Sequence, residues 1–553
     1  MEAFFIQNMA PIMFLALVLF LLLGYPAAFS LGAVGLLFGL IGIELGQFAP
    51  NFLQALPERI YGVMSNDTLL AIPFFTFMGL VLERSGMAED LLDTIGQLFG
   101  TVRGGLAYAV VFVGALLAAT TGVVAASVIS MGLISLPIMM RYGYDRRVAA
   151  GVIAASGTLA QIIPPSLVLI VMADQLGRSV GDMYEGAFIP GLVLAGLYAT
   201  YVFIVTILFP KATPGLPAEA IGFREDDGNR GLTSLGILTA AAAVFGWFMM
   251  RNSESHGADF VVLSMFFGIL FAFGVAIISW IVDKTTGFRF LSKMAQQTTF
   301  VMVPPLFLIF LVLGTIFIGV ATPTEGGAMG ASGALILGAL KRRLTWDLIR
   351  QATESTAKLS AFVVFILIGA RVFSLTFYGV SGHIWVENLL TSLPGGQVGF
   401  LIFVNAFVFV LAFFLDFFEL AFIVIPLLGP AAEHLGIDLI WFGVILGVNM
   451  QTSFMHPPFG FALFYLRSVA PREPYTDRLT GKRTDGITTG QIYWGAMPFV
   501  VIQVIMVLLV IFFPAMVMHY KGAATQIDPS KIKIEIPQID LPPLDFSSPP
   551  AIK

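Results

Sequence analysis

Two apolar stretches of the chain each carry a short run of hydroxyl and amide side chains followed by a pair of prolines. The first reads SGTLAQIIPPS and contains Pro164 and Pro165, and the second reads NMQTSFMHPPFG and contains Pro457 and Pro458. A proline pair removes two backbone donors and interrupts a helix, so carbonyl groups are left free for other partners. Such oxygens coordinate monovalent cations such as Na⁺, while the N-termini of half-helices favour a substrate carboxylate. The chemistry predicted is therefore ion and anion binding inside a membrane.

The side chains just before the prolines are the main candidates for this binding. They are Ser156, Gly157 and Thr158 in the first run and Asn449, Gln451 and Thr452 in the second. The Na⁺ candidates among them are Ser156, Thr158, Asn449 and Thr452. Two alternatives compete with binding: each run could be a kinked helix whose polar groups are satisfied by neighbours, or a set of hydrogen bonds that hold helices together. Because two such interruptions occur in one chain, we favour a binding role.

Several acidic side chains also lie in apolar surroundings. Asp416 and Glu419 occur in FFLDFFELAF, and Glu325 follows Thr324 in ATPTEGG. Carboxylates inside a membrane are costly and are functional hypotheses by default. For Glu325 an equally good explanation is that an acid in the first turn caps a helix.

His456 and Arg371 each have two explanations. His456 precedes the second proline pair, where it could titrate with a coupled proton, although a packed, neutral ring is the commoner case. Arg371 lies within an apolar span and could pair with a carboxylate or extend its charge to the membrane surface.

The composition identifies an all-α polytopic membrane protein. Hydrophobic residues make up 58% of the chain and charged residues 11%, and the apolar runs suggest about a dozen crossings. The net charge of -5 argues against nucleic-acid binding, and the absence of cysteine excludes disulfides. No phosphate-binding loop or catalytic motif is visible, so the chain is predicted to be neither an ATPase nor another enzyme. The first residues, MEAFFIQNMAPIMF, are expected to begin a retained helix, since they lack a basic region and a cleavage site.

The two proline pairs belong to a duplicated unit. Pro137 and Pro430, Gly143 and Gly436, and Asp145 and Asp438 all match at the same separation as the proline pairs. If the repeats are inverted, only one loop of each equivalent pair should be basic. The loop at 141–147 has three arginines while 434–440 has no basic residue except His434, and 467–486 is far more basic than 174–183. We therefore place 141–147 and 467–486 in the cytoplasm and the other two loops outside.

This assignment of loops to the two sides of the membrane requires two re-entrant hairpins and two discontinuous helices. The predicted organisation is a first repeat at 1–210, with a hairpin near 105–138 and a broken helix near 147–174; a cytoplasmic linker at 211–230; two extra transmembrane helices at 231–283; a second, inverted repeat at 299–517, with a hairpin near 398–433 and a broken helix near 441–469; and a proline-rich tail at 518–553. The first hairpin is expected to turn at Thr121 and Gly122, because glycine permits a tight reversal. Asp416 and Glu419 would lie at the tip of the second.

The stretches around both proline pairs and the ATPTEGG element resemble the large membrane subunit, DctM-like, of the tripartite ATP-independent periplasmic (TRAP) transporters. The resemblance covers nearly the whole chain except 211–297 and the tail. It implies an elevator-type transporter in the bacterial inner membrane that imports organic acids with Na⁺ as the coupling ion and without a cofactor. It also implies two protein partners, a periplasmic substrate-binding protein and a small four-helix membrane subunit.

The chain departs from the family pattern at three places. The usual SGSS tip is replaced by Thr121-Gly122-Val123-Val124, the second hairpin carries LDFFE, and the helices at 231–283 are extra. The extra helices are expected to contact lipid or the small subunit. The sequences MQTSF and GFALFYLR resemble those of the family branch that handles small monocarboxylates such as 2-oxo acids or lactate. The alternative function is a stand-alone ion-coupled carboxylate transporter without a binding protein.

Overall fold

The structure is a computed structural model that describes residues 2–122, 124–222, 225, 231–253, 257–458, 460–477, 481 and 483–521. Its contacts separate Met1–Tyr520 from Lys521–Lys553, and the description below concerns the first unit. The described part is almost wholly helical, with one antiparallel pair of short strands, β1 (Tyr475–Thr476) and β2 (Arg483–Thr484). Eight of its helices are long and apolar enough to cross a membrane, or up to 11 if each bent pair forms one span.

The first half of the chain contains a helical hairpin and a broken helix. Its helices are α1 (Glu2–Gln7), α2 (Met9–Leu22), α3 (Ala27–Glu44), α4 (Leu56–Met64), α5 (Ala71–Arg84), α6 (Met87–Phe99), α7 (Gly105–Thr121), α8 (Val124–Arg141), α9 (Arg146–Thr158), α10 (Leu167–Leu176) and α11 (Val180–Leu208), with short 3-10 turns at Phe52–Ala55, Asp67–Leu70, Leu159–Gln161 and Ala218–Ala220. The chain turns from α7 into α8 at Gly122, whose φ of 58° lies in the left-handed region that favours glycine. Asp145 caps α9 by accepting hydrogen bonds from two backbone N–H groups.

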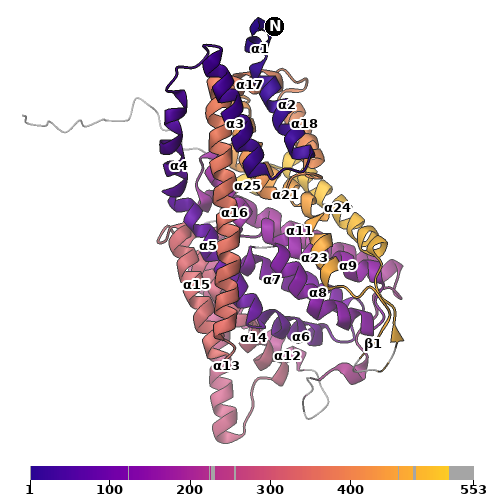
Figure 1. Cartoon of the computed structure of the whole chain (residues 1–553). Coiled ribbons are helices and arrows are strands. Elements are labelled where there is room, and N and C mark those ends of the chain that lie inside the picture. The colour runs from indigo at the N-terminus through magenta and orange to yellow at the C-terminus, as the bar shows by residue number, and fades with distance from the viewer. Residues whose placement is uncertain are drawn as a thin grey trace, which may run out of the picture. The chain divides into compact units, whose positions relative to one another are not determined.

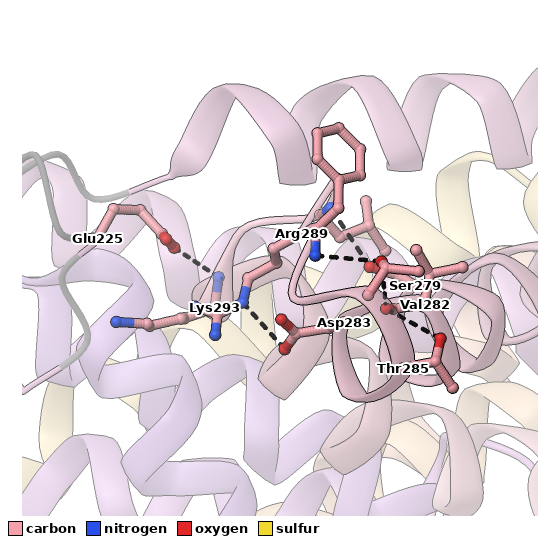
Figure 2. A network of polar contacts seen from close by, with 10 residues as sticks. Glu225, Ser279, Val282, Asp283, Thr285, Arg289 and Lys293 are labelled. Carbon is pink, nitrogen blue, oxygen red and sulfur yellow. Dashed lines mark hydrogen bonds and ion pairs between the residues drawn. The ribbon is translucent and has the colours of Figure 1, made fainter.

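Three helices connect the two halves: α12 (Leu232–Met250), α13 (Gly257–Thr286) and α14 (Lys293–Phe317). The turn between α13 and α14 is held by polar contacts (Figure 2). Arg289 forms an ion pair with Asp283 at 3.1 Å, and the backbone N–H of Leu291 donates to the Ser279 hydroxyl at 3.3 Å. The N–H of Lys293 donates to Glu225 at 2.5 Å, so the connecting segment before α12 is attached to the start of α14.

The second half begins with a long pair of helices and again contains broken elements. Its helices are α15 (Pro323–Leu340), α16 (Trp346–Gly379), α17 (Gly382–Thr391), α18 (Gly396–Leu411), α19 (Phe417–Ile423), α20 (Ile425–His434), α21 (Leu439–Met450), α22 (Thr452–Met455), α23 (Phe461–Val469), α24 (Thr489–Phe512) and α25 (Ala515–Met518). The 34-residue α16 runs beside α3 and α5 (Figure 1). It can approach α3 closely because Gly35 has no side chain, and the Thr376 hydroxyl donates to the Gly35 carbonyl at 2.7 Å.

The two broken helices run in opposite directions. Arg178, just after α10, pairs with Glu433, just before α21, at 3.0 Å. At the other end Arg141, just before α9, pairs with Asp477, which follows α23, also at 3.0 Å. Each ion pair thus joins the end of one broken helix to the start of the other. Arg141 and Asp477 lie in two loops that the charge pattern assigns to the cytoplasm, and Arg178 lies in an outer loop while Glu433 directly precedes the other outer loop, 434–440.

Candidate functional site

The backbone is interrupted at the same relative place in both broken helices. After α9 the chain makes a single 3-10 turn, passes Pro164 and Pro165, and re-enters a helix behind Ser166. The Ser166 hydroxyl donates to the Gln161 carbonyl at 2.5 Å, which replaces a hydrogen bond that the prolines remove. After α21 the short α22 leads to Pro457 and Pro458, and α23 begins at Phe461. Both proline pairs contain a cis peptide bond.

A cavity of about 320 Å³ lies where the interrupted elements meet, and we call it the central cavity. It is lined by Gly122, Val124, Ala125, Gln161, Leu167, Val168, Leu359, Phe362, Asp416, Phe417, Phe418, Phe454, Phe461 and Tyr465. Six of these side chains are aromatic, Asp416 is the one charged group, and no lysine, arginine or histidine is among the described residues that line it. The first residues of α8, α10, α19 and α23 all belong to this lining, so four helix N-termini border the cavity.

Two of the candidates from the sequence line the central cavity. Gly122 forms the turn of the first hairpin, and Asp416 stands immediately before α19. Thr121 is the last residue of α7, but its side chain, like Val123, lies outside the described residues. Pro164, Pro165, Pro457 and Pro458 shape the breaks and are not among the lining residues.

The remaining candidates before the prolines lie behind the cavity wall. Ser156, Thr158, Asn449, Gln451 and Thr452 have exposed fractions of 0–2%, and none lines the cavity. Two of these side chains donate hydrogen bonds to the backbone of other candidates. The Gln451 amide donates to the Thr158 carbonyl at 3.1 Å, and the Thr452 hydroxyl donates to the Asn449 carbonyl at 2.6 Å. The Asn449 amide donates to the carbonyl of Asn405 in α18 at 2.8 Å. These contacts tie the two breaks and the second hairpin together.

Gly157 has a packing role in this region. A Cβ at this position would lie 2.3 Å from a methyl group of Val128 in α8, so only glycine leaves room for the helix of the first hairpin. The break in α9 is therefore pressed directly against α8.

Several buried oxygens around the breaks lack a hydrogen-bond partner. They are Ser156 Oγ, Gln161 Oε1, Gln451 Oε1 and Gln503 Oε1. A buried polar atom without a partner is costly, so such a group calls for an explanation, for example an ion or a water molecule. Two of the four, Gln161 and Gln503, were not singled out from the sequence. Gln503 is one amide in the apolar run FVVIQVIMVLL, and its nitrogen donates to Thr158 Oγ1 at 3.3 Å and to the Tyr198 hydroxyl at 3.0 Å.

All three acidic candidates take part in helix capping. The Glu419 N–H donates to the Asp416 carboxylate at 2.8 Å and the Asp416 N–H donates to Glu419 at 3.0 Å, which forms a reciprocal capping box at the start of α19. Glu325 forms the same box with Thr322 at the start of α15 and is exposed. Thr324 donates to the Asp67 carbonyl at 2.6 Å. Neither Thr324 nor Glu325 lines the central cavity.

His456 and Arg371 lie in very different places. The His456 ring stacks on Phe413 with 4.1 Å between centroids and lies edge-on to Phe409 at 4.2 Å, and neither of its nitrogens has a hydrogen-bond partner. This is the packed arrangement. Arg371 lines a second cavity, farther along α16.

Comparison with known proteins gives a family match over nearly the whole chain. Residues 14–222 and 228–516 match the family model "Tripartite ATP-independent periplasmic transporter, DctM component". The matched residues include 228–297, which the motifs alone left outside the resemblance.

Two curated relatives and one solved structure illustrate the likeness. The C4-dicarboxylate TRAP transporter large permease protein DctM of Pseudomonas aeruginosa is 27% identical over 85% of this chain and 89% of the relative. The isethionate TRAP transporter permease protein DctMQ of Oleidesulfovibrio alaskensis is 23% identical over 93% of this chain and 66% of the relative. The crystal structure of the Alcanivorax borkumensis YdaH transporter has a TM-score of 0.46 at 15% identity, covering 83% of this chain and 87% of that chain.

Proposed function

The chain belongs to the DctM component family of the tripartite ATP-independent periplasmic transporters, and we propose that it imports a small organic monocarboxylate together with Na⁺. Its relatives are transport permeases and not enzymes, and the chain is a multi-pass protein of the inner membrane. The family implies a periplasmic binding protein and a small membrane subunit as partners. Substrates such as a 2-oxo acid or lactate fit the proposal.

The composition of the central cavity is the observation that carries this substrate class. Four helices begin at the cavity, and three of them, α8, α10 and α23, have no carboxylate at their N-terminus, so they place partial positive charge where an anion can bind. Its six aromatic side chains suit an apolar body. A dicarboxylate would bring a second anionic end into a cavity that has no basic side chain among the described lining residues, so one carboxylate is favoured over two.

Na⁺ coupling is supported by the unpaired oxygens next to this cavity. Gln161 lines the cavity, and its Oε1 is buried without a partner, as are Ser156 Oγ and Gln451 Oε1. Carbonyl and side-chain oxygens at helix breaks are the ligands that bind coupling ions in transporters. Asp416 supplies the one negative charge of the lining, which would favour a cation close to the substrate carboxylate.

The same geometry suits an elevator mechanism with re-entrant hairpins. The turn of the first hairpin at Gly122 and the start of α19 at Asp416 both border the central cavity, which is the position that two hairpin tips closing one site would take. We infer that the hairpins and broken helices move together relative to α3 and α16. The helices α12 and α13 then form a peripheral surface for lipid or the small subunit.

The decisive experiment is uptake into proteoliposomes that contain the purified permease with its small subunit. Uptake of labelled pyruvate and lactate is measured with and without a candidate binding protein, an inward Na⁺ gradient and ATP. We expect uptake that needs the binding protein and the Na⁺ gradient and ignores ATP. Uptake at full rate without the binding protein would favour a stand-alone transporter, and uptake that is indifferent to Na⁺ would refute the coupling.

A further inference from the structure

A second cavity lies farther along the same helices that line the central cavity. Its volume is about 520 Å³, and its walls come from α4, α10, α16, α19 and α20 together with the turn after α10. On α16, Phe362 borders the central cavity and Arg371 borders the second, which corresponds to about 14 Å along the helix axis. The second cavity also borders Gly177 and Glu433, beside the ion pair of Arg178 with Glu433 that we assign to the outer side. We call it the outer cavity.

Two arginines face the outer cavity without a protein partner. Arg59 comes from α4 and Arg371 from α16, both are exposed, and within the described part of the chain neither forms an ion pair or a hydrogen bond. Tyr378 also lines this cavity, and it is close enough to interact electrostatically with both guanidinium groups. Two guanidinium groups without an ion-pair partner in the described part of the chain therefore line one cavity.

The acids in the same cavity are already occupied by other donors. Asp174 accepts the Asn66 amide at 2.7 Å on one carboxylate oxygen and the Gln175 amide at 2.7 Å on the other. Glu433 is paired with Arg178 at 3.0 Å. Neither carboxylate pairs with Arg59 or Arg371, so the hydrogen-bond donors of both guanidinium groups are available to a ligand.

We propose that the outer cavity is a binding site for a small carboxylate anion, held by Arg59 and Arg371 before it moves to the central cavity. A guanidinium group presents parallel donors that match a carboxylate in a bidentate way. The two sites divide the recognition: the outer cavity selects the charge, and the central cavity, which has aromatic walls, selects the body. The identity of the anion rests on the proposed function, whereas the site itself rests on the two arginines. A lipid phosphate has the same acceptor chemistry, and the test separates the two sources.

The first test is transport kinetics of the full-length permease with its partners in proteoliposomes. Arg59→Gln and Arg371→Gln are compared with Arg350→Gln, an exposed arginine at the other end of α16 that pairs with Glu354. We expect each cavity variant to raise KM for pyruvate by about threefold or more, and the double variant by about tenfold, with kcat within about twofold of wild type. Added choline chloride at a fixed Na⁺ gradient should raise KM for wild type but much less for the double variant. Wild-type KM in both single variants would overturn the proposal.

The second test measures binding without transport. In dodecyl maltoside micelles, which contain no phosphate, sodium pyruvate should raise the unfolding temperature of the wild type relative to an equal concentration of NaCl, and this rise should be smaller in the double variant. An equal rise in both, or none in the wild type, would contradict an outer carboxylate site. If pyruvate stabilises only the wild type but no organic acid is transported, the site stands and the proposed function fails. Loss of tightly bound phospholipid phosphorus in the double variant with unchanged KM would assign the arginines to lipid and overturn the proposal.

Discussion

The side-chain amide of Gln451 donates a hydrogen bond to the backbone carbonyl of Thr158 at 3.1 Å, and these two residues occupy equivalent positions in the two predicted repeats. They are 293 positions apart, which is also the separation of Pro164 and Pro457 (457 − 164 = 293). A contact between equivalent positions lies on or near the pseudo-two-fold axis that relates inverted repeats. The two helix breaks therefore meet at the centre of the predicted symmetry.

Ser156→Ala should separate Na⁺ binding from folding. Because Ser156 Oγ is buried without a hydrogen-bond partner, its removal breaks no bond within the protein. We expect the Na⁺ concentration for half-maximal uptake to rise by about three- to tenfold while the unfolding temperature is unchanged or higher. Ser135→Ala is the matched control, since Ser135 Oγ in α8 is also buried and unpaired but is not at a break. An unchanged Na⁺ response for Ser156→Ala would remove Ser156 from the ion site.

Phe362→Ala should change which acids are accepted. The Phe362 ring lines the central cavity and lies edge-on to Phe418 with 6.2 Å between centroids, so its removal enlarges the apolar part of the site. We expect KM for lactate to rise by about tenfold, and bulkier monocarboxylates to become better competitors. Phe365→Ala serves as the control, because Phe365 is on the same helix and about as exposed (46% against 43% for Phe362) but packs on Phe29 and does not line the cavity. Competition assays with acids of increasing size measure both effects, and an unchanged size preference would argue against this wall of the site.

Asp416 can be tested for charge and for capping separately. Asparagine caps a helix about as well as aspartate, whereas alanine costs about 0.5–2 kcal/mol. We therefore expect Asp416→Asn to keep wild-type stability but to need about tenfold more Na⁺, and Asp416→Ala to lose both stability and Na⁺ affinity.

The control for this pair is Asp145→Asn. Asp145 caps α9 by accepting hydrogen bonds of 2.8 and 3.3 Å, but it is not among the residues that line the cavity. It should leave the Na⁺ response unchanged. If Asp416→Asn also transports with wild-type Na⁺ dependence, Asp416 acts as a helix cap alone.

Gly151→Ala should destabilise the contact of α9 with α24. A Cβ at Gly151 would lie 2.0 Å from the carbonyl oxygen of Gly495, and a Cβ at Gly495 would lie 2.1 Å from the carbonyl of Arg147. The backbones cannot stay this close with a methyl group between them, so we expect a loss of about 1–3 kcal/mol, measured as a lower unfolding temperature. Gly196→Ala in α11, where nothing lies within 4 Å, should be neutral or stabilising. Equal stability of the two variants would contradict the close packing.

Local signals in the sequence were sufficient for the positions of the turns and breaks. Proline pairs, Gly122 and the aspartates before α9 and α21 act through the backbone of their own segment, so their effects can be read without knowing the neighbours. The charge of the loops also predicted which ends of the two broken helices lie on the same side of the membrane. The ion pairs of Arg141 with Asp477 and of Arg178 with Glu433 join ends that were assigned to the same side.

The rotation of the broken helices could not be predicted in the same way. Every residue from Val148 to Thr158 in α9 is buried, so no exposed side reveals which residues face a cavity. The polar candidates were chosen by residue type, but most of the cavity lining is apolar, including five phenylalanines that look like any other core residue in the sequence. Gln503 was missed because an isolated amide in an apolar run carries no spacing pattern.

The hydrogen bond between Gln451 and Thr158 also bears on the origin of the protein. If the fused chain descends from two identical half-length chains, this contact was once a contact between two copies of the same residue. If both copies had a glutamine at this position, either side-chain amide could donate to the backbone carbonyl of the other copy. The present chain has a glutamine at one of the two positions and a threonine at the other. On that descent, fusion would let the two positions diverge, so that a symmetric junction becomes one with a distinct donor and acceptor. With Gln451 as the donor and Thr158 as the acceptor, the two breaks of the present chain are chemically different, so each can have a separate role.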